Sequence, residues 1–147
     1  MKMFRSTGDD IDENILSTCA FSTDKQFLYA GTVMGDIKMF SLSSGDEYET
    51  FQCHESVISH IEPHRDQPLI ITCSTYRQPY SKIWSIGEFF EEKMSCRTEE
   101  HLEFSKLVQD KLVGTCADGV ATIWDINTAQ TVRTLTPTNC NNYKSNK

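Results

Sequence analysis

The feature of the sequence that most limits its possible folds is an aromatic landmark that recurs about every 40 residues. The strings IKMFSL, SKIWSI and ATIWDI each place an aromatic residue after an apolar one and before a polar–apolar pair. Their aromatic residues are Phe40, Trp84 and Trp124, separated by 44 and 40 positions. A period of about 40–45 residues that ends in an aromatic–Asp pair is typical of β-propeller blades.

Each period also contains four short strand-like runs separated by turn residues. The expected strands are 15–21, 27–32, 37–41 and 48–52 in the first unit, 57–63, 69–74, 81–86 and 93–97 in the second, and 101–105, 111–116, 120–126 and 131–136 in the third. The stretch 87–94 could form a helical turn, but no run of helical periodicity reaches about 12 residues. We therefore predict an all-β fold, a partial WD-repeat β-propeller of about three four-stranded antiparallel blades.

The repeats predict how the 147 residues are divided. We expect a lead-in, three blade units, and a tail or the start of a missing blade; these cover 1–14, 15–56, 57–98, 99–136 and 137–147. The length alone would fit one ordinary domain. Closed propellers use roughly four to eight blades, so three blades leave two blade edges unpaired and prone to association. We expect an incomplete propeller that is marginally stable, aggregates or is completed by further chain.

Charge and hydropathy exclude several classes of protein. The net charge of −7 is poorly suited to attracting nucleic acid or anionic lipid. No run approaches the roughly 18 apolar residues of a membrane-spanning helix. The opening string MKMFRSTGDD has no apolar stretch behind its basic residues, so we expect no secretory signal.

The six cysteines indicate the redox compartment. No Cys-x-x-Cys pair occurs, which excludes a zinc knuckle and a thioredoxin-like motif. Cys19, Cys73 and Cys116 lie inside apolar strand-like runs, where a free cysteine acts as a small hydrophobic residue. We predict reduced structural thiols and an intracellular protein.

The second unit resembles the WD-repeat template in detail. In that template a histidine before the first strand of a blade meets a Ser or Thr, an Asp and the repeat Trp in a hydrogen-bonded tetrad. His54, Thr72 (or Ser74) and Trp84 fit this pattern, because a buried indole N–H needs a partner. The third unit offers Thr115, Asp118 and Trp124 but has no histidine, with Arg97 near that position. In the first unit, Thr32, Met34 and Phe40 stand at the matching places. We predict that the structural blade residues are His54, Thr72, Trp84, Thr115, Asp118 and Trp124.

One loop of the second unit is a candidate partner-binding surface. Tyr76, Arg77 and Gln78 lie between its second and third strands, and we expect this loop on the same face as His54. Tyr and Arg are enriched at the centres of protein interfaces, and Pro79 stiffens the loop. The alternative, equally supported by the sequence, is that Tyr76 packs on a neighbouring loop.

The sequence contains no recognisable catalytic or cofactor motif. Phosphate-binding glycine loops, a Gly-x-Ser-x-Gly elbow and a His-Glu-x-x-His string are all absent. Cys53 and His54 resemble a nucleophile and base, but adjacent residues usually point apart. His60 and His64 could share a strand face and, with His54, form a weak metal site, although structural histidines are the better interpretation. We predict no catalytic, cofactor-binding or metal-binding residues, and a protein that is not an enzyme.

Longer strings indicate a particular family. They are MFRSTGDDID, ILSTCAFSTD, FLYAGTVMGDIKMFSLSSGDE, CHESVISHIEP, TYRQPYSKIW, EEHLEFSKLVQDKLVGT, DINTAQTVRTL and NNYKSNK. Together, over about residues 3–144, they closely resemble the first part of the propeller of the Vpr-binding protein family, called mahjong in insects. The resemblance implies a non-enzymatic substrate receptor of the cullin-4 RING ubiquitin ligase. Its complete propeller would dock on the adaptor, damaged-DNA-binding protein 1, and present substrate proteins for ubiquitination. The expected location is the nucleus and cytoplasm, with the nucleus favoured.

One departure from that family concerns adaptor binding. Docking in this class is associated with Trp-Asp-x-Arg boxes, in which Arg follows the repeat aromatic residue by three positions. Ser43, Gly87 and Asn127 stand at those positions here. The resemblance therefore implies adaptor docking through the complete propeller, not through a Trp-Asp-x-Arg box of this chain. The alternative function is a WD-repeat interaction scaffold unrelated to ubiquitin, in chromatin or trafficking.

Overall fold

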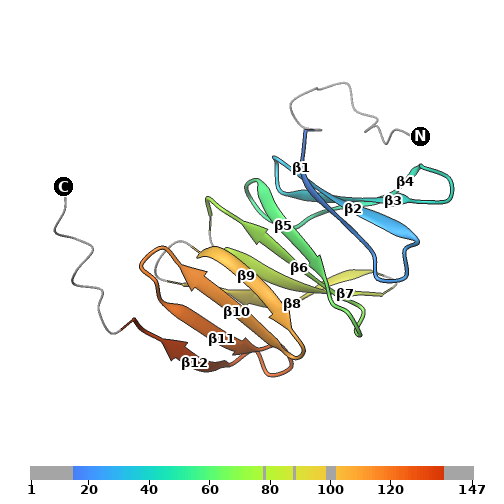
Figure 1. Ribbon diagram of the computed structural model, residues 1–147. Coiled ribbons are helices and arrows are strands. Elements are labelled where there is room, and N and C mark those ends of the chain that lie inside the picture. The colour runs from blue at the N-terminus through green and yellow to red at the C-terminus, as the bar shows by residue number, and fades with distance from the viewer. Residues whose placement is uncertain (1–14, 78, 88, 99–101, 138–147) are drawn as a thin grey trace.

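The computed structural model describes residues 15–77, 79–87, 89–98 and 102–137. These residues form three four-stranded antiparallel sheets, and no helix occurs among them. Within each sheet the strands follow their order in the chain, and the three sheets follow one another along the molecule (Figure 1). The prediction of an all-β partial propeller with about three blades is confirmed.

The strand bounds define the blades. Blade 1 contains β1 (Leu16–Phe21), β2 (Phe27–Thr32), β3 (Asp36–Ser41) and β4 (Glu47–Gln52); blade 2 contains β5 (Ile58–Pro63), β6 (Leu69–Ser74), β7 (Ser81–Ile86) and β8 (Phe90–Cys96); blade 3 contains β9 (Leu102–Val108), β10 (Lys111–Cys116), β11 (Ala121–Asp125) and β12 (Thr131–Leu135). The stretch considered for a helical turn is largely strand, because β8 pairs with β7 from Phe90 opposite Ile86 onward. No helix of the described residues could span a membrane.

Blade 2 is packed on both of its faces, because successive apolar residues of its strands point alternately to the two faces. Ile70 and Trp84 face blade 1 and join a core cluster with Ile37 and Ile58. Ile71 and its neighbours on the other face join a second cluster that includes residues of blade 3. A strand covered on both faces is expected to be a nearly continuous apolar run, as LIITCS in β6 is.

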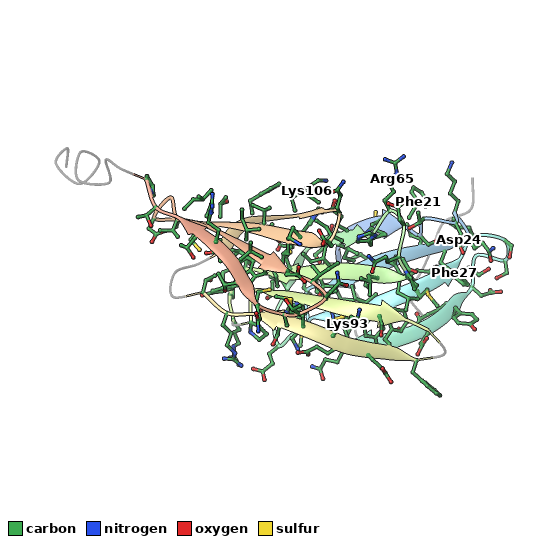
Figure 2. The ribbon with its side chains drawn as sticks, turned by 90° about the horizontal axis from the view of Figure 1, so that it is seen from below. Phe21, Asp24, Phe27, Arg65, Lys93 and Lys106 are labelled. Atoms are coloured by element: carbon green, nitrogen blue, oxygen red, sulfur yellow. The ribbon has the colours of Figure 1, made fainter. Side chains whose placement is uncertain are left out.

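Hydrogen bonds also join successive blades at the end of the molecule that carries the β1–β2 and β5–β6 turns. Thr23 Oγ1 donates to the His64 carbonyl at 3.0 Å. The buried His64 ring places Nε2 2.7 Å from the Gln109 carbonyl of blade 3, and Glu62 pairs with Lys106 at 2.7 Å. Figure 2 shows this end through the labelled side chains Phe21, Asp24 and Arg65.

The two faces of blade 3 differ in what covers them. The face that carries Leu112 and Trp124 packs against blade 2. On the opposite face Phe104, Val108 and Leu135 are each about half exposed. An apolar sheet face of this kind is suited to packing against another blade.

The cysteines of the described residues are all free thiols. Cys73 and Cys116 are buried, as their apolar runs indicate, and so are Cys53 and Cys96. Cys19 is a free thiol as expected, but the expectation that it acts as a small hydrophobic residue was wrong, because this side chain is exposed. It lies on β1, where alternate residues face away from blade 2. Cys140 lies outside the described residues.

Candidate partner-binding site

The site is built on a tight turn that fixes the backbone before blade 2. Gly35 has a φ of 98°, a conformation that disfavours other residues. Its carbonyl accepts the backbone N–H groups of both Cys53 and His54 at 3.0 Å. A Cβ at this position would overlap the His54 carbonyl oxygen, so glycine is also required by the close approach. The turn thereby fixes where the His54 side chain enters blade 2.

His54, Thr72 and Trp84 are brought together by this arrangement. His54 Nε2 lies 2.8 Å from Thr72 Oγ1, and the indole Nε1–H of Trp84 donates to the same oxygen at 2.9 Å. A hydroxyl can accept from the indole and still share a hydrogen bond with the imidazole. Ser74, the alternative to Thr72, instead bonds the Ser56 hydroxyl at 2.7 Å. The contact joins the segment before β5 to β6 and β7.

The electrostatics of this cluster do not suit acid–base or nucleophilic chemistry. Burial, aided by the nearby charge of Lys82, lowers the pKa of His54 from its ordinary 6.5 to about 4. Burial raises the pKa of the Cys53 thiol far above its ordinary value. Cys53 packs into the apolar core, and its thiol and the His54 imidazole both lie against the Thr72 side chain. Near neutral pH the imidazole of His54 is therefore uncharged and the thiol of Cys53 is protonated, as suits buried structural side chains.

The third unit does not repeat the contact, and the expected role of Thr115 requires a correction. Trp84 pairs with Ile70 and contacts Thr72 two residues further, whereas Trp124 pairs with Leu112. The residue that matches Thr72 is therefore Gly114, where an added Cβ would meet the Trp124 ring. Thr115, one position on, lies on the opposite face of the sheet.

The remaining structural candidates have local roles. Asp118 Oδ1 accepts the Val120 N–H at 2.9 Å and so stabilises the β10–β11 turn. No hydrogen bond between Asp118 and Trp124 is found within the described part of the chain. In blade 1, Thr32 Oγ1 accepts the Asp36 N–H at 3.0 Å, and Met34 is half exposed.

The β6–β7 loop lies on the same face as His54, as the sequence indicated. Arg77 Nη1 pairs with Glu55 Oε2, next to His54, at 3.2 Å. Tyr76 is 78% exposed, so the alternative in which it packs on a neighbouring loop is not what the structure has. Gln78 lies outside the described residues.

A cavity of about 450 Å³ lies between this loop and the His54 segment. We call it the His54 pocket; its lining includes Cys53, His54, Glu55, Arg77, Lys82 and Arg97. Sequence reasoning did not assign Lys82 or Arg97 to a site. Lys82 lies in the strand-like run SKIWSI, and Arg97 was noted only as standing near the position of the histidine that the third unit lacks.

The other histidines do not converge. His60 is about half exposed and lies 3.8 Å from Glu62, whereas His64 is buried against Gln109. Within residues 15–77, 79–87, 89–98 and 102–137, no group of three side chains could hold a metal ion.

Comparison with known proteins supports the assignment of the fold. The β-propeller domain of Cps50 (Swd1) from Myceliophteria thermophila superposes with a TM-score of 0.74 at 8% sequence identity. The match covers 86% of this chain and 44% of that one. No protein-family model matches the chain.

Two curated relatives share more of the sequence. Protein mahjong of Drosophila melanogaster is 36% identical over 136 residues, which cover 92% of this chain and 9% of that protein. The DDB1- and CUL4-associated factor homolog 1 of Caenorhabditis elegans is 29% identical over 119 residues, covering 81% and 7%. The chain thus spans less than a tenth of either relative. With its three propeller-type blades, the chain belongs to the family of Protein mahjong and DDB1- and CUL4-associated factor homolog 1.

Proposed function

We propose that this chain is part of the propeller of a substrate receptor for a cullin-4 RING ubiquitin ligase. The receptor is not an enzyme; it docks on the adaptor and presents proteins to the subunits that transfer ubiquitin. The observation that carries the proposal is the 36% identity to Protein mahjong across 92% of the chain. The name of the second relative, DDB1- and CUL4-associated factor homolog 1, supports the same role.

The part proposed for this segment is to hold substrate rather than adaptor. Ser43, Gly87 and Asn127 replace the arginine of the Trp-Asp-x-Arg boxes, so adaptor contacts are assigned to other blades of the complete propeller. The exposed Tyr76 and the neighbouring Arg77 offer the aromatic and guanidinium groups that commonly anchor protein interfaces. Predominantly nuclear location is part of this proposal.

Affinity purification of the full-length protein from cells tests the receptor role. Recovery of the damaged-DNA-binding protein 1 adaptor and of cullin-4 supports it. Recovery of chromatin or trafficking proteins without either component would favour the alternative scaffold function.

The Tyr76→Ala plus Arg77→Ala variant tests the substrate surface in the same experiment. We expect it to recover the adaptor normally but to lose a subset of other partners, with an unchanged melting temperature because both side chains are exposed. An unchanged set of partners would argue against a substrate surface at this loop.

A further inference from the structure

The His54 pocket has the opposite charge balance to the chain as a whole. The chain carries a net charge of −7. The pocket is lined by three cationic side chains, Arg77, Lys82 and Arg97, and by one carboxylate, Glu55. A concave site of one sign within a surface of the other sign attracts groups complementary to the site. Those groups are anionic.

Lys82 is held in place before any ligand arrives. Its Nζ lies 2.7 Å from Glu92 Oε2 and 5.2 Å from the centre of the Trp84 ring. Its side chain is only 16% exposed. Burial is the main cause of the lowered pKa of His54; the charge of Lys82 acts in the same direction and the charge of Glu92 opposes it.

The two arginines are available to a ligand for different reasons. The Arg77–Glu55 pair is 66% and 77% exposed, and such exposed pairs contribute only about 0–1 kcal/mol. A ligand carboxylate can therefore replace Glu55 at little cost. Arg97 is exposed, and no carboxylate within the described residues pairs with it. A guanidinium binds a carboxylate through two parallel hydrogen bonds.

The surroundings favour a peptide over a nucleic acid. Pro79 and the buried Cys53 add apolar lining, and the exposed ring of Tyr76 adjoins Arg77. Apolar contacts and an aromatic rim suit a polypeptide segment. The net charge of −7 of the chain opposes a polyanion that extends far beyond the pocket.

Resting on the receptor role proposed above, we propose that the His54 pocket binds an acidic segment of substrate proteins, with Arg77 and Arg97 contacting its carboxylates and Lys82 as a third cationic side chain of the lining. Glu55 occupies the position of one ligand carboxylate in the free protein. Substrates are thereby selected by a short run of Asp or Glu residues.

Fluorescence anisotropy with the purified full-length protein tests this assignment. The probe is a labelled peptide with four consecutive glutamates, and its matched control has four glutamines. We expect binding of the glutamate peptide only. Arg77→Gln and Arg97→Gln should each weaken it about fivefold, which corresponds to one charge contact. Glu55→Gln should tighten it, because the competing carboxylate is lost.

Arg65→Gln is the matched control, since Arg65 is an exposed arginine at the opposite end of the strands (Figure 2). It should change the affinity less than twofold. Equal binding of both peptides, an Arg65→Gln effect as large as that of Arg97→Gln, or tighter binding of a single-stranded oligonucleotide would overturn the assignment. The peptide assay contains no adaptor, so its result is independent of the receptor role. If the protein captures the adaptor but does not bind the glutamate peptide, only the acidic-segment assignment is refuted. If it binds the glutamate peptide specifically but does not capture the adaptor, only the receptor role is refuted.

Discussion

His54 Nε2 lies 2.8 Å from Thr72 Oγ1, and this single oxygen also accepts the indole N–H of Trp84. These residues are 18 and 12 positions apart in the chain, so the contact ties the segment before β5 to β6 and β7. All three side chains are buried, where an unpaired polar group costs free energy. The hydroxyl of Thr72 is therefore central to the stability of the site.

Replacing that hydroxyl should destabilise the chain. Thr72→Val keeps the shape but leaves the His54 and Trp84 ring nitrogens without their partner, so we expect a loss of about 2–4 kcal/mol in urea unfolding. Thr115→Val is the control: it should cost under about 1 kcal/mol, because Thr115 lies on the face away from Trp124. Equal losses would mean that the register of blade 3 is wrong.

Stability should depend on pH through His54. The folded chain keeps this ring neutral down to about pH 4, whereas the unfolded chain protonates it near pH 6.5. The neutral His54 ring adds its full contribution to the free energy of unfolding above about pH 6.5. That contribution is lost as the pH falls toward 4, by about 2 kcal/mol between pH 7 and pH 5. His54→Gln should be less stable at pH 7 but flatter over this range. His60→Gln, at an exposed position, should keep the full dependence; if it alone flattens the curve, His54 is not the responsible group.

The turn at Gly35 should tolerate no side chain. Gly35→Ala introduces strain at positive φ and a clash with the His54 carbonyl, and we expect a loss of about 2 kcal/mol or more. The control is Gly87→Ala, since a Cβ there meets only the Phe89 carbonyl at 3.8 Å. Thermal unfolding measures both variants, and a Gly35→Ala protein as stable as the control would contradict the turn geometry.

The thiols should differ in reactivity. We expect iodoacetamide at pH 8 to modify Cys19 quickly, whereas Cys53, Cys73, Cys96 and Cys116 stay protected until the chain unfolds. Burial supports this by raising the pKa of Cys96 to about 12 and that of Cys73 as well. Peptide mass spectrometry measures the extent of modification at each cysteine. Rapid labelling of Cys73 in folded protein would show that blades 2 and 3 separate.

The exposed face of blade 3 should drive self-association of the isolated chain. Phe104→Ser plus Val108→Ser removes half-exposed apolar groups from it and should lower the sedimentation coefficient across a concentration series. Phe89→Ser, at an exposed turn, is the control and should leave association unchanged. A wild-type chain that is monomeric and melts sharply would contradict this proposal.

The period and the turn residues were enough to predict the blades, because alternating apolar residues between turns can only pair as short strands. Contacts that depend on strand register were harder to predict. A shift of one residue separates Gly114, which faces Trp124, from Thr115, which does not. The exposure of Cys19 depends in the same way on which face of β1 meets blade 2. Lys82 and Arg97 join one pocket through the pairing of β7 with β8, where Ser81 lies opposite Cys96, and the sequence pattern does not record that register.

Direct binding between purified full-length protein and the purified adaptor, damaged-DNA-binding protein 1, is the most direct test of the central proposal. Mass photometry measures the complex without cellular intermediaries. The proposed receptor role predicts a stable one-to-one complex that also forms with the Tyr76→Ala plus Arg77→Ala variant. Absence of any complex, with both proteins folded, would contradict it.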